Sequence, residues 1–361
     1  MSGLVACFSG IEDPRARNCT YRLGDLIVLM VAASLCGVEG ASDIAEFAEL
    51  RKGTLNRLVP YTRAPSHDTF SRLLRTLDPA SFARAFEVFS AAFAKALRPA
   101  GDAAAAAVVA VDGKALRRAY ESGLRHQPPL VVSAFAAEAR LCLACVAAGE
   151  DNEVETALKV VDLLDLTGQI LTADALHCHH RMAEAVSAKN GDYMLALKPN
   201  RQSWFAEAEG QFARIKPERQ AEETDNTHGR HEWRKAEVIA ARHPLTRNHA
   251  AFVRITSARH GEETHQRYYL SSRLLTGRQA LAVVRAHWQI ENNLHWMLDV
   301  HLAEDASRAR KDNAPANTAV LKRIARNVLQ CADQPKVRIS RRIKRCNWSD
   351  DYLINALTHM R

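Results

Sequence analysis

Apolar positions recur every three or four residues through much of residues 1–100, which is the spacing of helices. Residues 21–50 are predicted to form two helices, and Ser42 is the expected N-cap of the second. Two further amphipathic helices are predicted to begin near Ser66 and Pro79. The pattern therefore predicts an all-α N-terminal domain.

Two interpretations of this helical domain remain open. A short helix, a turn and a helix carrying His67, Arg72 and Arg75 would fit a DNA groove. A packed bundle with a solvated basic face explains the same residues equally well.

From Ala103 the pattern changes to short apolar runs that are typical of strands. The runs AAAAVVAVDGK, PLVVSAFAA and RLCLACVAA are joined by short turns, which predicts an antiparallel meander. Helix, strand, helix and strand then alternate over residues 153–198. This order predicts an α/β fold with a ribonuclease H-like mixed five-stranded sheet flanked by helices, in which the first and fourth strands lie side by side.

Three carboxylates stand in an apolar context. Asp112 and Asp174 each end the apolar face of a predicted strand, one on the first strand and one on the fourth. Glu291 lies on the apolar stripe of a helix predicted from about Arg278 to Met297. Buried carboxylates are costly unless a positive charge compensates them, and a pair of divalent cations is a common solution.

Each acid also has a simpler interpretation. An Asp after a strand is often a turn or cap residue, and the VDG that contains Asp112 could form a hairpin turn. A salt bridge with Arg285 or Lys198 would account for Glu291. The metal interpretation is favoured because it explains all three acids at once.

The remaining segments differ in texture. Residues 201–272 are polar with β-like pieces, which predicts a β-rich insertion within a catalytic core at 101–200 and 273–312. Residues 313–361 are predicted to form a basic helical C-terminal tail, with six Lys or Arg between positions 336 and 345. Basic runs are usually solvated, but next to a nucleic-acid site we expect this one to contact phosphates.

Composition narrows the class of protein. The 361 residues carry 49 Lys and Arg against 41 Asp and Glu, a formal net charge of +8 that weakly favours a polyanionic partner. The eight cysteines have no framework spacing, and Cys142 and Cys145 fall on opposite faces of a strand. We therefore expect reduced thiols and no zinc site, and we attribute the run from His177 to His180 to the start of a helix.

Targeting signals are absent from the sequence as given. The opening MSGLVACFSGIEDP lacks a charged n-region, and no uncharged run approaches the ~18–20 residues that span a bilayer. We expect a cytoplasmic protein without a membrane partner.

Several motifs resemble those of one family. DGKALRR, LTADALHC, DYMLALKPN, HGRHEWR, RYYLSS and RAHWQIENNLHWMLDVHLAEDASRAR resemble the DDE transposases of bacterial insertion sequences, within the H-repeat-associated protein group. DPRARNCTYRLGDLIVLMVAASLCG and RRIKRCNWSDDYL resemble the two ends of the same group, so the resemblance covers nearly the whole chain.

The resemblance implies a catalytic site. Asp112, Asp174 and Glu291 occupy the places of the family's catalytic acids and would hold two Mg²⁺ ions, with Mn²⁺ able to substitute. Water would attack the phosphodiester at the element's end, and the freed 3′-OH would then attack target DNA. The implied partner is double-stranded DNA, both as the terminal repeats of the element and as the target. The DNA-bound form is expected to be a homodimer, and its implied location is the nucleoid of a bacterium.

The chain departs from the related larger set that shares the insertion. There a Tyr and an Arg precede the catalytic Glu and a Lys follows it, whereas this chain has Val284, His287 and Leu298. The departures weaken the expected phosphate contacts of this helix and leave the metal site intact. His287, His295, Arg308 and Arg310 are candidates to replace them.

The residues expected to contact DNA surround this site and extend into the insertion. They are Lys114, Arg117, Lys198, Asn200, His228, Arg230, Arg234, His287, Trp288, His295, Arg308 and Arg310. Trp233 or Trp204 could stack on a flipped base, although a small core under the insertion is the simpler explanation for both. Two other functions stay open: a nuclease on the same fold that cuts without joining, and a decayed DNA-binding protein derived from a transposase.

Overall fold

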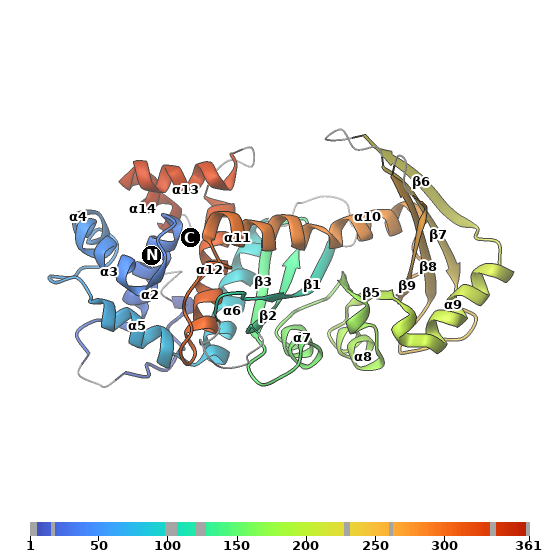
Figure 1. The fold of residues 1–361 in the computed structure, drawn as a ribbon, viewed down its shortest axis with the longest axis horizontal. Coiled ribbons are helices and arrows are strands. Elements are labelled where there is room, and N and C mark those ends of the chain that lie inside the picture. Colours follow the sequence, from blue (N-terminus) through green and yellow to red (C-terminus); the bar gives the residue numbers. More distant parts are fainter. Residues whose placement is uncertain are drawn as a thin grey trace.

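A group of helices and one long mixed sheet make up the protein (Figure 1). The structure is a computed structural model that describes residues 6–15, 19–97, 107–119, 128–226, 232–259, 263–332 and 337–358. The helices gather at one end, and the sheet extends from them to the opposite end.

The N-terminal domain is helical as predicted. Its helices are α2 (Leu23–Leu35), α3 (Gly40–Leu50), α4 (Lys52–Leu55), α5 (His67–Thr76) and α6 (Pro79–Leu97). Ser66 caps α5 by accepting the Thr69 N–H, but the N-cap predicted at Ser42 is wrong because α3 begins two residues earlier. In the described part of the chain no single helix is long and apolar enough to cross a membrane; only α2 and α3 together would qualify, and they meet at a 95° bend.

The sheet has nine strands in the order β3-β2-β1-β4-β5-β9-β8-β7-β6. They are β1 (Ala107–Ala115), β2 (Leu130–Ala136), β3 (Leu141–Ala147), β4 (Gln169–Ala173), β5 (Asp192–Leu197), β6 (Arg219–Asp225), β7 (Glu232–Ala240), β8 (Ala251–Arg259) and β9 (His265–Ser271). The antiparallel β1-β2-β3 meander and the parallel pairing of β1 with β4 are confirmed. Because Val111 pairs with Ala173, Asp112 and Asp174 follow at the same end of neighbouring strands.

The predicted count of five strands is wrong. Strand β9 pairs antiparallel with β5, from Met194 opposite Ser271 to Leu197 opposite Tyr268, and joins the strands of the insertion to the same sheet. The backbone groups along the free edge of β5 find partners in this way. The apolar pattern of β5 did not indicate its pairing with β9, because a strand buried on both faces has the same pattern at the edge of a sheet as at its centre.

Helices cover both faces of the sheet (Figure 1). One face packs on α7 (Glu153–Asp162), α8 (His180–Ala188) and α9 (Gln202–Arg214). The other face, which carries Val108 and Ala110, packs on α10 (Gly277–His287) and α12 (Ala314–Cys331). Asp112 stands at every-second-residue spacing from Val108 and Ala110 along β1. Its side chain therefore points to the same face of the sheet, the one that α10 covers.

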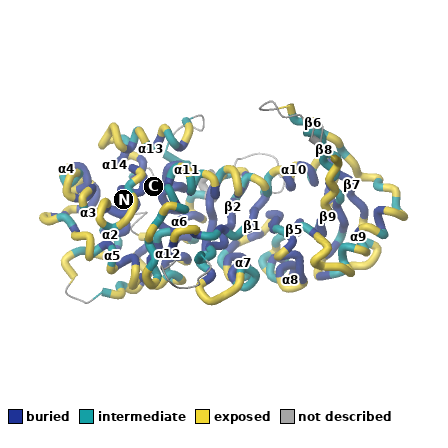
Figure 2. The backbone as a smooth tube through the Cα atoms, in the orientation of Figure 1, coloured by how far each residue is buried: buried dark blue, intermediate teal, exposed yellow. Residues whose placement is uncertain are grey.

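One hydrophobic core joins the two ends of the chain. Side chains of α2, α5 and α6 pack in it with those of α12, α13 (Ile339–Trp348) and α14 (Asp350–Thr358). Figure 2 shows the buried backbone running through this group of helices. Asn347 donates to the Cys36 carbonyl at 2.9 Å, which fixes α13 against the end of α2. The segment expected to be a tail is thus packed against the N-terminal helices.

Five charged side chains, three buried and two half-buried, form a group that we call the ion cluster: Lys114, Glu304 and Arg323 with Asp299 and Asp305. Lys114 Nζ lies 2.8 Å from Asp299 Oδ1 and 2.7 Å from Asp305 Oδ1. Arg323 Nη1 lies 2.6 Å from Glu304 Oε1, and Arg323 Nε donates to Ser133 Oγ at 3.0 Å. The cluster therefore links β1 and β2 to α12 and to the turn that follows α11 (Trp296–Leu302).

Replacing Glu304 with Gln would leave the Arg323 guanidinium buried without an ionised partner. We expect the free energy of unfolding to fall by ~3–5 kcal/mol, the usual loss when one member of a buried ion pair is removed. Urea denaturation measures the difference. The control is Asp351→Asn, which breaks the exposed Arg57–Asp351 pair and should cost at most ~1 kcal/mol. Equal losses in the two variants would contradict a structural role for the cluster.

Candidate catalytic site

Two of the three predicted acids sit at neighbouring strand ends. Asp112 lies near the end of β1, and its side chain is 20% exposed. Asp174 follows β4 directly and accepts the Leu176 N–H at 2.9 Å through Oδ1, which caps the 3₁₀ turn Ala175–His177. The cap reading and the functional reading of Asp174 are compatible, because the carboxylate has a second oxygen.

Glu291 lies where the predicted helix is interrupted. The helix begins with a capping box formed by Thr276 and Gln279, runs as α10 to His287, and then widens to a π-helical turn over Glu291–His295 before α11. A single regular helix from 278 to 297 was therefore wrong. Inserted π turns are frequent at functional sites, because they displace one side chain from the regular stripe.

The interrupted helix brings Glu291 to the two aspartates. A cavity of about 350 Å³ is lined by Asp112, Asp174 and Glu291 together with Lys198 and Trp288. The other side chains that line it include Thr172, Met194, Arg267, Tyr269, Val284 and His287. The salt bridge with Arg285 considered for Glu291 is not formed, since Arg285 pairs with Glu223.

Ligand atoms of Asp112 and Glu291 lie within 4.8 Å of one another in the wall of the cavity. Burial, reinforced by the neighbouring Glu291 carboxylate, raises the pKa of Asp112 well above its ordinary value. His295 acts in the opposite sense on Glu291: its Nδ1 lies 3.4 Å from Glu291 Oε2 and lowers the pKa of that carboxyl. The environment therefore shifts the two carboxyls in opposite directions, favouring the protonated form of Asp112 and the ionised form of Glu291.

His295 completes this group. It is buried, and its Nδ1 lies 3.7 Å from Asp112 Oδ2. The DNA contact predicted for His295 is not supported, because the imidazole faces the carboxylates inside the protein. The sequence offered one sign of this arrangement: His295 stands four residues after Glu291, on the same helical stripe.

The donor set fits a hard divalent cation. Ligand atoms of Asp112, Glu291 and His295 lie within 4.8 Å of one another, and Asp174 faces the same cavity. Carboxylate oxygens are the ligands that Mg²⁺ prefers. A bound cation would compensate the negative charge that Asp112 and Glu291 bring close together.

Other side chains of the cavity supply a cation and an aromatic ring. The Arg267 guanidinium lies over the Trp288 ring at 5.5 Å, and Trp288 is 45% exposed. His287 Nδ1 lies 3.0 Å from Thr172 Oγ1, and burial lowers the pKa of His287. Sequence reasoning missed Arg267, because a lone Arg on a strand of the insertion carries no motif.

The structure separates the predicted DNA contacts into groups. Lys198, His287 and Trp288 line the cavity. Arg117 follows Asp112 in the sequence, and its side chain is 79% exposed. Lys114 is only 8% exposed and belongs to the ion cluster, so its predicted phosphate contact is not supported. His228 and Arg230 lie outside the described residues.

Polar contacts within the protein occupy three more of the singled-out residues. Asn200 donates to the Ala175 carbonyl at 3.2 Å, so its side-chain amide has a partner within the protein. Arg234 pairs with Glu232 at 2.7 Å. Trp204 packs against the core beneath the insertion, as the simpler explanation expected, and Trp233 donates to Glu222 at 3.3 Å.

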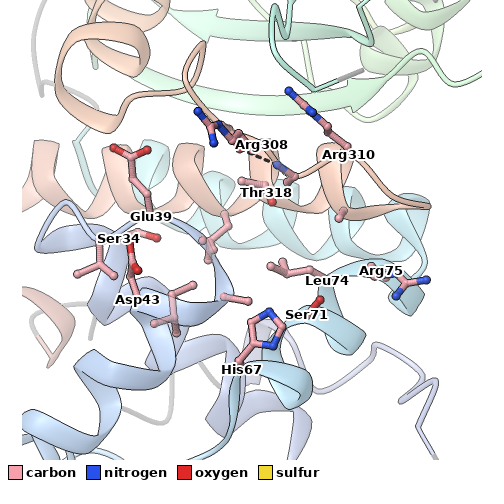
Figure 3. Close-up of a pocket in the computed structure, with 18 of the residues that line it drawn as sticks. Ser34, Glu39, Asp43, His67, Ser71, Leu74, Arg75, Arg308, Arg310 and Thr318 are labelled. Atoms are coloured by element: carbon pink, nitrogen blue, oxygen red, sulfur yellow. Dashed lines mark hydrogen bonds between the residues drawn. The ribbon is translucent and has the colours of Figure 1, made fainter. Parts of the chain in front are cut away.

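Arg308 and Arg310 line a different cavity, of about 760 Å³, between α5 and the segment that follows α11 (Figure 3). His67 and Arg75 face them from α5, but Glu39 and Asp43 lie on the same walls. Arg75 also pairs with Asp312 at 2.6 Å. The mixed charge of this cavity does not favour phosphate, and neither arginine replaces the missing Arg of the catalytic helix.

Comparison with known proteins identifies the family. The transposase DDE domain matches residues 104–328, and the domain described as DDE_Tnp_1-associated matches residues 5–90. The chain belongs to the transposase DDE domain family. The resemblance predicted from the motifs is thereby confirmed.

Relatives align with this DDE-family protein over most of its length. YhhI of Escherichia coli (strain K12), an H repeat-associated protein, is 28% identical over 356 residues, which are 93% of this chain and 92% of YhhI. YbfL of the same strain is 28% identical over 374 residues, 98% and 97% of the two chains. A piggyBac transposase in a synaptic complex with hairpin DNA aligns over 99% of this chain and 82% of its own, with a TM-score of 0.43 and 12% identity.

Divalent cations should stabilise this DDE-family protein by binding the acidic site. We expect Mg²⁺ or Mn²⁺ at about a hundred times its dissociation constant to add ~2.7 kcal/mol to the free energy of unfolding, and to raise Tm accordingly. Glu291→Gln should remove this increase. Glu155→Gln, which alters an α7 carboxylate that pairs with Arg181, should preserve it. Thermal unfolding with EDTA and with each cation measures both. A cation effect that survives in Glu291→Gln would place the ion elsewhere.

Proposed function

We propose that the protein is a DNA transposase that cuts at the ends of an insertion sequence and transfers the resulting strand to target DNA. The observation that carries the proposal is the convergence of Asp112, Asp174 and Glu291 on one cavity. These acids come from three segments far apart in the sequence, in a chain of the transposase DDE domain family.

The proposal includes a ribonuclease H-like catalytic core. The strand order β3-β2-β1-β4-β5, with β1 parallel to β4 and β4 parallel to β5, supports it. In this division residues 101–200 and 273–312 form the core, and residues 201–272 are an insertion whose strands continue the sheet. Residues 1–100 and 313–361 supply the helices that pack at the other end.

The three acids share one task in this mechanism. Asp112, Asp174 and Glu291 would together hold the two ions. When bound, two Mg²⁺ ions supply Lewis-acid activation to both oxygens of an in-line displacement at phosphorus. Burial and the neighbouring Glu291 favour the protonated form of Asp112, so its deprotonation would accompany ion binding, and His295 favours the ionised form of Glu291. Trp288 and Arg267 line the same cavity, where a base and a phosphate of the scissile strand would lie.

Arg267 offers an explanation for the departure at His287. The catalytic helix of the related larger set carries an Arg at that place, and this chain has a buried imidazole bonded to Thr172. A guanidinium is nonetheless present in the same cavity, supplied by β9 rather than by the helix. We therefore assign Arg267 the phosphate contact, together with Lys198.

Strand transfer requires two DNA ends, so we propose that the DNA-bound form is a homodimer. Its place of action would be the nucleoid of a bacterial cell, as the resemblance implies. Terminal repeats and target DNA are then the double-stranded partners.

Asp112→Asn, Asp174→Asn and Glu291→Gln should each abolish cleavage while leaving binding of the element's end intact. Each substitution removes a ligand charge from the cavity without removing a surface cation, so we expect a loss of at least ~10³-fold in cleavage rate, the scale set by losing transition-state electrostatics. A labelled duplex carrying the flanking terminal repeat, with Mg²⁺ and with EDTA, provides the measurement. Electrophoretic mobility shift of the same duplex provides the binding control.

The products decide between the remaining functions. A 3′-OH end that is then joined to a second duplex identifies a transposase. Cleavage without joining would indicate a nuclease on the same fold. Specific binding without cleavage under any divalent ion would indicate a decayed, DNA-binding descendant and would overturn the proposal.

A further inference from the structure

Helix α13 carries a row of exposed cations. Arg341 and Lys344 lie three residues apart on α13, and Arg338 is the N-cap residue directly before the helix. All three are exposed, and they line a shallow groove of about 440 Å³ together with Val337 and Arg345. We call Arg338, Arg341 and Lys344 the α13 face.

The opposite side of α13 is fixed to the core. Ile339 and Cys346 are buried in the helical core. Arg342 is also buried, and it donates to the carbonyls of Leu329 and Gln330 on α12, both at 2.6 Å. The apolar side of the helix is thus already in use, which argues against a helix that lies on a membrane.

The cations of the α13 face have no carboxylate partner within 4.0 Å in the described part of the chain. Exposed basic residues elsewhere do have one: Arg57 with Asp351 at 2.9 Å, and Arg181 with Glu155 at 2.5 Å. Asp350, at the start of α14, contacts Arg51 and Thr54 and none of the three cations of the α13 face. Three neighbouring uncompensated cations repel one another, and an external polyanion would relieve that repulsion.

An exposed indole accompanies the cations. Trp348 is 66% exposed at the end of α13, and the Arg341 guanidinium lies over its ring at 5.5 Å. The ring restricts Arg341 to one direction, which lowers the entropy cost of a phosphate contact.

The position of α13 relates this face to the catalytic helix. Figure 1 shows α13 on the side of the sheet that α10 and α11 cover, opposite α7 and α8. Glu291 lies in the turn between α10 and α11. A long, stiff polyanion that crosses the Glu291 side of the molecule would therefore pass toward α13.

We propose that the α13 face binds the phosphate backbone of the DNA duplex engaged by the catalytic cavity, at a point away from the scissile phosphate. The contact is independent of base sequence, since it involves charge and no groove. The inference rests on the proposed function only in taking DNA as the ligand.

The test is a triple variant, Arg338→Gln with Arg341→Gln and Lys344→Gln, measured for binding to a fluorescent duplex without the terminal repeat, in EDTA. Each lost phosphate contact should lower the slope of log K against log salt by ~0.9, so we expect the slope to fall by about two to three. Affinity at about 0.1 M salt should fall at least tenfold. The matched control is Arg57→Gln with Lys159→Gln and Arg181→Gln, which removes the same charge from exposed positions that have carboxylate partners.

The control variant should keep a slope within about half a unit of the wild type. Both variants should retain the Tm of the wild type, since neither changes a buried group. Equal slopes for the two variants, or loss of binding to phosphatidylserine vesicles in place of DNA, would overturn the assignment. This experiment measures binding and not cleavage, so it is independent of the test of the proposed function. A lower slope for the triple variant of a protein that does not cleave DNA would support this inference alone. Cleavage by a protein whose triple variant keeps the wild-type slope would support the proposed function alone.

Discussion

The ion cluster connects two parts of the chain that carry candidate catalytic acids, Asp112 and Glu291. Lys114 lies two residues beyond Asp112 on β1, and its ammonium is held by Asp299 on α11 and Asp305 just after it. The same helix follows directly on the turn that contains Glu291. Charges this deeply buried are tolerated only when they are paired, so the cluster fixes the register between strand and helix.

The catalytic cavity has the opposite electrostatic balance. In the ion cluster each carboxylate faces a cation at hydrogen-bond distance, whereas in the cavity Asp112 and Glu291 lie close together, and burial and Glu291 raise the pKa of Asp112. Such an arrangement costs stability, and it persists because the surrounding packing holds it. The well-compensated cluster next to it provides that support. The proposed site for divalent cations would thus combine uncompensated carboxylates in the cavity with paired charges a few residues away.

Local periodicity was sufficient to find the acids and insufficient to describe their surroundings. Alternation along β1 and β4 placed Asp112 and Asp174 at matching strand ends, and the helical stripe identified Glu291. The pairing of β9 with β5 depends on contacts between residues some seventy positions apart, which no local pattern encodes. The π turn at Glu291 and the burial of Lys114 likewise follow from tertiary packing. His295 and Lys114 were misassigned for one reason: a basic side chain near an acid site was taken to face DNA when it faces the protein.

Net charge is for the same reason an indirect guide to DNA binding in this chain. Arg323, Arg326 and Arg342 are almost completely buried and bond to carbonyls or carboxylates inside the protein. Arg342 even belongs to the basic run that suggested a phosphate-binding tail, while Arg338 and Arg341 beside it are exposed. What matters for a polyanion is the set of cations that the fold leaves without partners. Arg338, Arg341 and Lys344 of the α13 face belong to that set, and the proposed duplex would meet the protein there and at the candidate catalytic cavity.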